Sequence, residues 1–323
     1  MFSKAVGTAI GYTRPLVVST RMHNGVVKTD TATYTVINDD GWAITAAHVM
    51  DSMVKFQSDQ NKIREIAEIN AKRPEAAAIK VEPDAITHHS FWWGWDGVMI
   101  TKAFVNRQMD LAVVHLNGIG DRVREFPVLA DPERPRPGTS LCRLGYGFCN
   151  ISTNFDEASK NFRIPPMKPE ELVFPNECMH TRTIDRGTTK EEDFRMVYIE
   201  TSSPGIGGQS GGPIIDVEGR LHAMQVNTVH HPLGFHPTAE YEGRTVVENQ
   251  FLNLGVGLSV ASIRAVLDSK NVRYDAEGDE TGYRITGRIP SSRPRECPTG
   301  CRHGVCPCPR RARQEGSIRT MLL

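Results

Sequence analysis

A chain of 323 residues is long enough for one large domain or two small ones. Hydrophobic residues make up 39% and charged residues 24% of it, the balance of a globular protein that buries a core. The formal net charge is +0, so the charge of the whole chain does not favour nucleic acid or an anionic membrane as a partner.

The sequence predicts a cytoplasmic protein that does not contact a membrane. No stretch approaches the ~20 apolar residues that span a bilayer, and residues 5–11 make a poor secretory signal. Cys142, Cys149 and Cys178 are scattered and form no disulfide framework, which agrees with a reducing compartment.

The N-terminal half reads mainly as strands. Residues 16–18 indicate an edge strand, and residues 34–37, 38–41 and 42–45 indicate a strand, a hairpin turn and a returning strand. His48 follows that hairpin directly. A lone histidine at a strand end is more often structural than catalytic, so its role depends on the rest of the chain.

Three features come next along the chain. Residues 59–71 have the apolar spacing of an amphipathic surface helix inserted between strands. Residues 91–95 hold three of the four tryptophans and favour a core or loop-anchoring role over ligand binding. Asp110 then opens an apolar strand, where it is either a candidate functional carboxylate or a strand-capping residue.

The middle of the chain begins with a proline-rich connection at 131–137, which we interpret as a crossing between two halves. A strand at 141–143 and a Gly-Tyr turn follow it. Residues 152–176 are polar and proline-rich, and a loop of this length could border a substrate cleft.

Within residues 205–214, Ser210 has four close glycines, at 207, 208, 211 and 212, and a proline and apolar residues follow. A serine hydroxyl is a poor nucleophile at neutral pH and needs a base and a site for the developing oxyanion. Glycines can supply that site because a backbone without Cβ can turn its N–H groups toward a bound carbonyl. Residues 194–201 indicate a strand before this loop, and residues 213–227 a hairpin after it.

The C-terminal third contains two further histidine- or cysteine-bearing segments. Residues 228–250 carry three histidines without thiolates or spaced carboxylates, which favours a loop over a metal site.

Ser259 begins a predicted helix that runs to 267. Residues 288–323 carry eight arginines and two glutamates, a net charge of +6, and we expect a disordered basic tail. A zinc site is the alternative there, formed by Cys297, Cys301, Cys306 and Cys308.

The flanks of His48, Asp110 and Ser210, in that chain order, resemble those of chymotrypsin-fold serine peptidases, particularly the bacterial trypsin-like and HtrA-like members. This resemblance implies an all-β fold of two six-stranded antiparallel Greek-key barrels with a C-terminal helix. It places the peptidase domain at 1–270, with the crossing near 131–137, and a C-terminal extension at 271–323.

The resemblance also implies a function, that of a serine endopeptidase without a cofactor that acts on polypeptides. Ser210 would be the nucleophile, His48 the base and Asp110 its orienting carboxylate, and backbone N–H groups of Gly208 and Ser210 would hold the oxyanion. Pro204 would lie at the base of the substrate pocket, and Val226 and Asn227 along its side. Because Pro204 carries no charge, the expected substrate has a small or medium apolar side chain before the cut.

Two other functions fit parts of the sequence. Residues 208–212 match the G-x-S-x-G motif of α/β-hydrolases, but an apolar strand follows the serine where that fold has a helix. A catalytically silent peptidase-fold domain that binds a protein partner is the other alternative. A nucleic-acid-binding function would depend on the arginine-rich tail alone.

Overall fold

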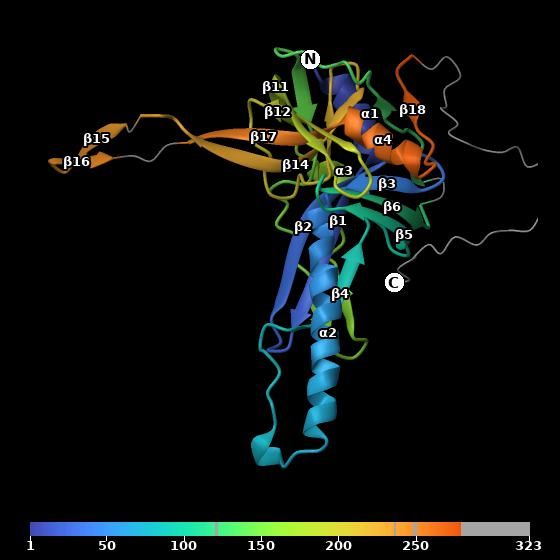
Figure 1. The fold of residues 1–323 in the computed structure, drawn as a ribbon, viewed down its shortest axis with the longest axis vertical. Helices are drawn as coiled ribbons and strands as arrows, with labels where there is room; N and C mark the ends of the chain where they lie inside the picture. Colours follow the sequence, from blue (N-terminus) through green and yellow to red (C-terminus); the bar gives the residue numbers. More distant parts are fainter. Residues whose placement is uncertain (120–121, 236, 248–250, 279–323) are drawn as a thin grey trace, which may run out of the picture. The chain divides into compact units, whose positions relative to one another are not determined.

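Two antiparallel sheets with the same strand order carry the fold (Figure 1). Counted in chain order within each half, the six main strands lie in the order 4-1-2-3-6-5 in both sheets. The order 4-1-2-3 is that of a Greek key. The computed structural model describes residues 1–119, 122–235, 237–247 and 251–278, so the cysteines and arginines of the predicted tail lie outside the described residues.

The first sheet belongs to the N-terminal half. Its strands are β1 (Thr13–Met22), β2 (Val27–Val36), β3 (Trp42–Thr45), β4 (Ile86–Trp92), β5 (Met99–Asn106) and β6 (Leu111–Asn117). The predicted hairpin at 34–45 is formed by β2 and β3. The predicted edge strand at 16–18 is wrong in its position, because β1 pairs with β2 on one side and with β4 on the other.

The second sheet closes into a six-stranded barrel. Its main strands are β8 (Ser140–Arg143), β11 (Asn176–Thr188), β12 (Arg195–Thr201), β13 (Pro213–Ile215), β14 (Leu221–Pro232) and β17 (Phe251–Ser259). The pairing of β13 with β14 joins the two ends of the 4-1-2-3-6-5 order. The predicted all-β fold class is therefore confirmed. The second half is a closed barrel, and the first is a curled sheet whose end strands β4 and β5 do not pair with each other among the described residues.

Short strands and helices complete the described chain. The short strands are β7 (Val128–Leu129), β9 (Asn154–Asp156), β10 (Asn161–Arg163), β15 (Thr238–Tyr241), β16 (Arg244–Val247) and β18 (Asp275–Ala276). The helices are α1 (Ser3–Tyr12), α2 (Asp51–Asn70), α3 (Pro169–Leu172) and α4 (Val260–Ser269), with 3-10 turns at Ala47–Met50 and Glu75–Ala77.

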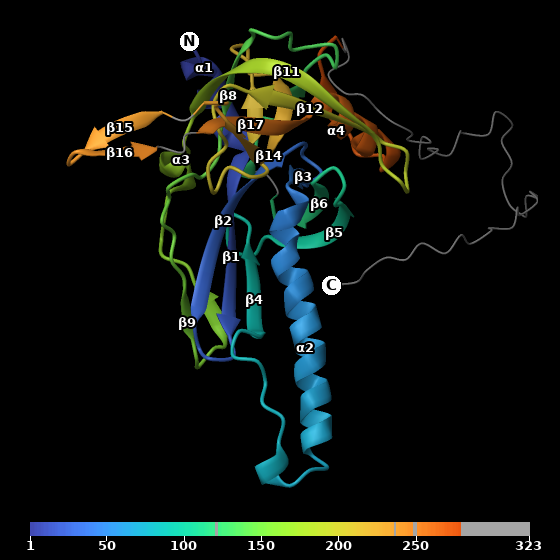
Figure 2. The same ribbon diagram turned by 60° about the vertical axis from the view of Figure 1, so that its left-hand side comes forward.

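Helix α2 is longer than the predicted surface helix, since it begins at Asp51 rather than at 59. Figure 2 shows it running along β4. The carboxylate of Asp59 accepts the backbone N–H of Ile86 at 2.8 Å and the ammonium of Lys55 at 2.6 Å. The side chain of Gln60 donates to the carbonyl of Ile86 at 3.0 Å. These bonds attach an otherwise polar helix to the sheet edge.

Two large apolar clusters stabilise the two halves and join them. One lies in the first sheet around Tyr34 and Trp93 and includes Ile215 of the second barrel. The other combines α4 and the second barrel with Ile44 and Val113 of the first sheet. Trp93 is 1% exposed, so the core role predicted for the tryptophan cluster holds for this residue. Burial of each such side chain contributes about 1.5–3 kcal/mol.

The crossing between the sheets comes earlier than residues 131–137. Strand β7 already pairs in the second sheet, in parallel with β14 and β18, so the chain leaves the first sheet between 118 and 127. Beyond 270, Val272 and Tyr274 are buried in the second cluster, and the compact unit continues past the predicted domain end.

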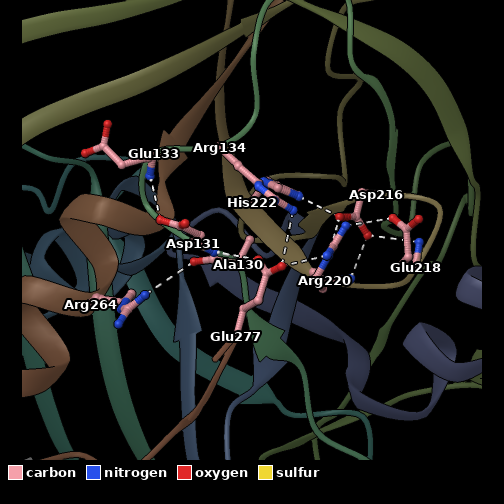
Figure 3. A network of polar contacts seen from close by, with 10 residues as sticks. All are labelled: Ala130, Asp131, Glu133, Arg134, Asp216, Glu218, Arg220, His222, Arg264 and Glu277. Carbon is pink, nitrogen blue, oxygen red and sulfur yellow. Dashed lines mark hydrogen bonds and ion pairs between the residues drawn. The ribbon is translucent and has the colours of Figure 1, made fainter. Parts of the chain in front are cut away.

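A polar network ties the end of the described chain to the turn after β13 (Figure 3). The carboxylate of Glu277 accepts Arg220 at 2.7 Å and Arg134 at 3.3 Å. Arg220 also donates to Asp216 at 2.7 Å, and the buried imidazole of His222 lies 2.8 Å from the same carboxylate. A hollow of about 760 Å³ lies beside this network, and no candidate site residue lines it.

Residues 228–250 are not the predicted loop. Strand β14 continues to Pro232 and pairs with β17 as far as Phe251, and β15 and β16 form a further hairpin between them. Figure 1 shows the two long strands continuing as a two-stranded arm. Several large apolar side chains on the arm are exposed, among them Phe235, Tyr241 and Phe251.

Candidate active site

His48 lies where β3 gives way to a short 3-10 turn. The strand ends at Thr45, and residues 47–50 turn the chain into α2. The buried alanines Ala46 and Ala47 pack under the turn, while the side chain of His48 remains 46% exposed. The local structure therefore presents the imidazole at the surface of the first sheet.

Asp110 lies in the turn between β5 and β6, directly before β6. Its φ of +56° is in the left-handed region, which aspartate tolerates better than most residues. Its carboxylate accepts the backbone N–H of His48 at 2.9 Å and contacts the ring Nδ1 at 2.7 Å. Its own carbonyl accepts the N–H of Ala47 at 3.2 Å. These contacts fix the Nδ1–H tautomer, so the other ring nitrogen is left with a lone pair.

The pKa of His48 is raised above its ordinary value of 6.5. The hydrogen bond to Asp110 is the largest cause, and the charges of Asp110 and Asp51 add to it, while partial burial acts in the opposite direction. A histidine in this setting accepts a proton more readily than a free imidazole does.

The Ser210 loop has a backbone that only glycine can follow. Gly208 has a φ of +94°, and a Cβ there would lie 2.2 Å from the carbonyl oxygen of Tyr146. Gly211 has a φ of +87°, and its Cβ would lie 2.1 Å from the carbonyl oxygen of Thr33. The glycines around Ser210 thus let the loop pack closely against the predicted Gly-Tyr turn and against β2.

Gln209 faces inward and is fully buried. Its side-chain oxygen accepts the N–H of Ile206 at 3.1 Å, and its nitrogen donates to the carbonyl of Phe174 at 3.2 Å. Gln209 therefore braces the loop from within, a role that the sequence did not reveal. Phe174 belongs to the predicted cleft-bordering segment 152–176, and no residue of that segment lines the cavity at Ser210.

Strands of both halves hold the loop from outside. The carbonyl of Ser210 accepts the N–H of Thr33 at 2.9 Å, and the hydroxyl of Thr35 donates to the carbonyl of Gly211 at 3.2 Å. The N–H of Gly211 donates to the carbonyl of Gln225 in β14 at 2.8 Å. The loop is thus fixed between β2 and β14.

The N–H groups of Gly208 and Ser210 donate no hydrogen bond to other described residues. Two unused donors close together on one loop are what an oxyanion site requires.

A cavity of about 440 Å³ brings the predicted residues together. His48, Asp110, Ser210, Val226 and Asn227 all line it. In the described part of the chain no hydrogen bond joins the imidazole of His48 to the hydroxyl of Ser210. In a free enzyme such a bond is often long and tightens when substrate binds.

Pro204 and Gly208 do not line that cavity. The carbonyl of Pro204 is held by the guanidinium of Arg143 at 2.8 Å and by the side chain of Asn176 at 2.9 Å. Arg143 is fully buried, so it anchors the start of the Ser210 loop from inside the second barrel.

The cavity also has lining residues that the sequence did not indicate. Gln108 and Arg186 line it, and the guanidinium of Arg186 stands 5.0 Å from the ring of Tyr198, which also faces the cavity. Gln225 is 3% exposed, and its side chain lies so close to Gly205 that a Cβ there would be 2.1 Å from the amide nitrogen. No local pattern marks these residues, because their roles depend on the packing of distant strands.

The described residues contain no group of three or more histidines, cysteines or carboxylates that could hold a metal ion. Cys142, Cys149 and Cys178 are free thiols. Within the same residues, no helix has the length and apolar character needed to cross a bilayer.

Comparison with solved structures finds proteases among the similar chains. The chain is similar in structure to the protease Rv3671c of M. tuberculosis in its active form, with 13% identity and a TM-score of 0.44 over 81% of this chain and 82% of that one. It is also similar to the HtrA-type protease AlgW bound to a tripeptide, with 12% identity and a TM-score of 0.42 over 84% of this chain and 63% of that one. No curated protein matches the sequence.

The family comparison covers most of both sheets. The model of the trypsin-like peptidase domain matches residues 32–224, which include His48, Asp110 and Ser210. This match extends over more than half of the chain. The chain therefore belongs to the trypsin-like peptidase domain family.

Proposed function

We propose that this chain is a serine endopeptidase in which Ser210 is the nucleophile, His48 the general base and Asp110 the residue that orients the base. One observation carries the proposal: Asp110 holds the ring of His48 at 2.7 Å, and His48 and Ser210 line the same cavity. The family match supports a peptidase, and the geometry supports these roles.

The chemistry requires one proton acceptor and one oxyanion site. Ser210 Oγ attacks the carbonyl carbon of the scissile peptide and passes its proton to His48 Nε2. The N–H groups of Gly208 and Ser210 hold the resulting oxyanion. The C–N bond then breaks, the amine leaves with the proton from His48, and an acyl-enzyme remains. Water, with His48 again as base, hydrolyses the ester and restores Ser210.

The strand edge beside Ser210 favours a polypeptide substrate over a small ester. β14 pairs with β13 up to Met224, and from Asn227 to Pro232 it pairs with β17 alone among the described residues. The N–H of Thr228 is bound by the side chain of Asn227 at 2.8 Å, so it faces away from β17. An extended peptide can therefore pair with this open edge, with Val226 and Asn227 beside the scissile bond.

The pocket next to Ser210 favours a small side chain before the cut. The sequence predicts Pro204 at its base, but Gly205 lines the cavity and Pro204 does not, and Arg143 fixes the carbonyl of Pro204. The amide of Gln225 closes the space against Gly205. No carboxylate besides Asp110, which is bound to His48, lines the cavity, so an arginine or lysine side chain finds no counter-charge.

Digestion of a peptide library followed by mass spectrometry tests the proposal. The wild type should cut internal peptide bonds, while Ser210→Ala and His48→Ala should lose at least 10³-fold in rate, as expected for triad members. Ser202→Ala, which alters an exposed serine near the same loop, serves as the matched control. A wild type without cleavage, or cleavage that survives Ser210→Ala, would favour a peptidase-fold binding domain instead.

A further inference from the structure

The hydroxyl of Thr33 lies at the junction between β2 and the Ser210 loop. It donates to the carbonyl of Gly208 at 2.6 Å and accepts the N–H of Tyr146 at 3.2 Å. The side chain is fully buried, and a Cβ on Gly145 would lie 2.8 Å from its oxygen. The hydroxyl therefore occupies the space that a side chain at position 145 would need, inside a close-packed interior.

Thr33 also touches the other peptide groups of the candidate machinery through its backbone. Its N–H donates to the carbonyl of Ser210 at 2.9 Å. Its carbonyl accepts the hydroxyl of Thr45, the last residue of the strand before His48, at 2.8 Å. One residue thus links the histidine strand to Gly208 and Ser210, the two residues that flank Gln209.

We propose that Thr33 is a positioning residue for the oxyanion site, acting through Gly208. This inference rests on the proposed function. The φ of +94° at Gly208 leaves its peptide groups with the rotational freedom of glycine, because no side chain restrains them. The hydroxyl of Thr33 fixes the carbonyl of Gly208, and its backbone N–H fixes the carbonyl of Ser210. The N–H donors of Gly208 and Ser210 each belong to the same residue as one of these bonded carbonyls, so their orientation is restrained as well. Preorganised donors stabilise an oxyanion more than donors that must reorient during the reaction.

The neighbouring Thr35 provides a matched comparison. It lies on the same strand, is equally buried, and donates to the carbonyl of Gly211 at 3.2 Å. Loss of its hydroxyl removes a buried hydrogen bond to the same loop without touching Gly208. Replacing either threonine by valine should therefore destabilise the loop to a similar extent. Only replacement of Thr33 should weaken stabilisation of the oxyanion.

The test compares Thr33→Val, Thr33→Ser and Thr35→Val with the wild type, by steady-state cleavage of a peptide and by affinity for a peptide boronate that mimics the oxyanion. Thr33→Val should lower kcat about 10- to 100-fold with little change in KM, less than the roughly 10²- to 10³-fold loss of a direct donor. Its boronate affinity should fall in parallel. Thr33→Ser and Thr35→Val should stay within threefold of the wild type, while thermal unfolding should show similar losses for both valine variants.

Three results would overturn the proposal: an unchanged kcat in Thr33→Val, an equal loss in Thr33→Ser, or an equal loss in Thr35→Val. With an active wild type, any of these refutes only the role of Thr33. A wild type that neither cleaves peptides nor binds the boronate would refute the peptidase function and the positioning role together.

Discussion

Asp110 holds His48 at two atoms, with one carboxylate oxygen 2.9 Å from the backbone N–H and the other 2.7 Å from the ring Nδ1. The first bond fixes the turn and the second fixes the ring, so the position and the tautomer of His48 have the same cause. The two residues are 62 positions apart, and they lie at the same end of two neighbouring strands, His48 after the end of β3 and Asp110 before the start of β6. Their geometry therefore depends on the pairing of β3 with β6.

The acidic limb of the pH–rate profile should lie above pH 6.5. The hydrogen bond to Asp110 raises the pKa of His48, and the base works only in its neutral form, so activity should fall as the pH drops through that raised value. The measurement is kcat/KM from pH 5 to 9. Asp110→Asn should move the limb to lower pH and reduce kcat by roughly 10³- to 10⁴-fold. If Asp110→Asn leaves the acidic limb at the same pH, that result would contradict the pairing of Asp110 with His48 in solution.

Replacing Gln225 should widen substrate preference. Its amide fills the space against Gly205, so Gln225→Ala opens room for a larger apolar side chain. Relative kcat/KM for peptides with leucine against alanine before the cut should rise by about 10-fold or more, since each added buried methylene contributes about 0.8 kcal/mol. Gln108→Ala, at another part of the cavity lining, should change this ratio less than threefold. Strong cleavage after arginine by the wild type would contradict the uncharged pocket.

Cleavage should improve with the length of peptide before the scissile bond. The open edge of β14 continues past Thr228 to Pro232, so peptides with six residues before the cut can form backbone bonds that three-residue peptides cannot. N-methylation of the peptide backbone should lower kcat/KM at alternate positions, because successive N–H groups of a strand face opposite sides. Equal rates for short and long peptides would show that the arm does not contact substrate.

Asp216 should stabilise the fold at neutral pH and lose this effect in acid. Burial opposes its charge, but bonds from His222 and Arg220 prevail and lower its pKa to about 2 from 3.8. Because the folded pKa is depressed, the contribution is complete above about pH 4 and disappears as the pH falls toward 2. Asp216→Asn should cost roughly 2 kcal/mol of unfolding free energy at pH 7, measured with urea.

The control for that measurement is Glu218→Gln. Glu218 pairs with the same Arg220 but is 58% exposed, so its loss should cost less than about 1 kcal/mol. A constant difference between wild type and Asp216→Asn from pH 7 down to pH 3 would contradict the assigned pKa direction.

Local patterns in the sequence predicted the parts of the fold that depend on neighbouring residues. The hairpin of β2 and β3 follows from residues 34–45, and the start of α4 follows from Ser259, whose hydroxyl accepts the N–H of Ala261 at 3.3 Å. The strand 194–201 before the Ser210 loop is β12 within one residue. Each of these elements shows its own periodicity or capping signal.

Features that depend on residues far away in the sequence cannot be predicted from local patterns. The sequence predicts a loop where the arm lies, because the polar, histidine-rich strands of the arm are stabilised by pairing with residues about twenty positions away. Likewise, Thr33 looks like an ordinary strand residue, and its contact with Gly208 spans 175 positions. The joint significance of His48, Asp110 and Ser210 came from resemblance to a family, since spacing alone does not bring them together.

The most direct test of the account is covalent labelling with a fluorophosphonate, followed by mass spectrometry of the labelled peptide. Only a serine that is activated by a base and supported by an oxyanion site reacts quickly with this reagent. The account predicts one label, on Ser210, that is lost in Ser210→Ala and greatly slowed in His48→Ala. A wild type that takes up no label at Ser210, or one that labels equally well without His48, would contradict it.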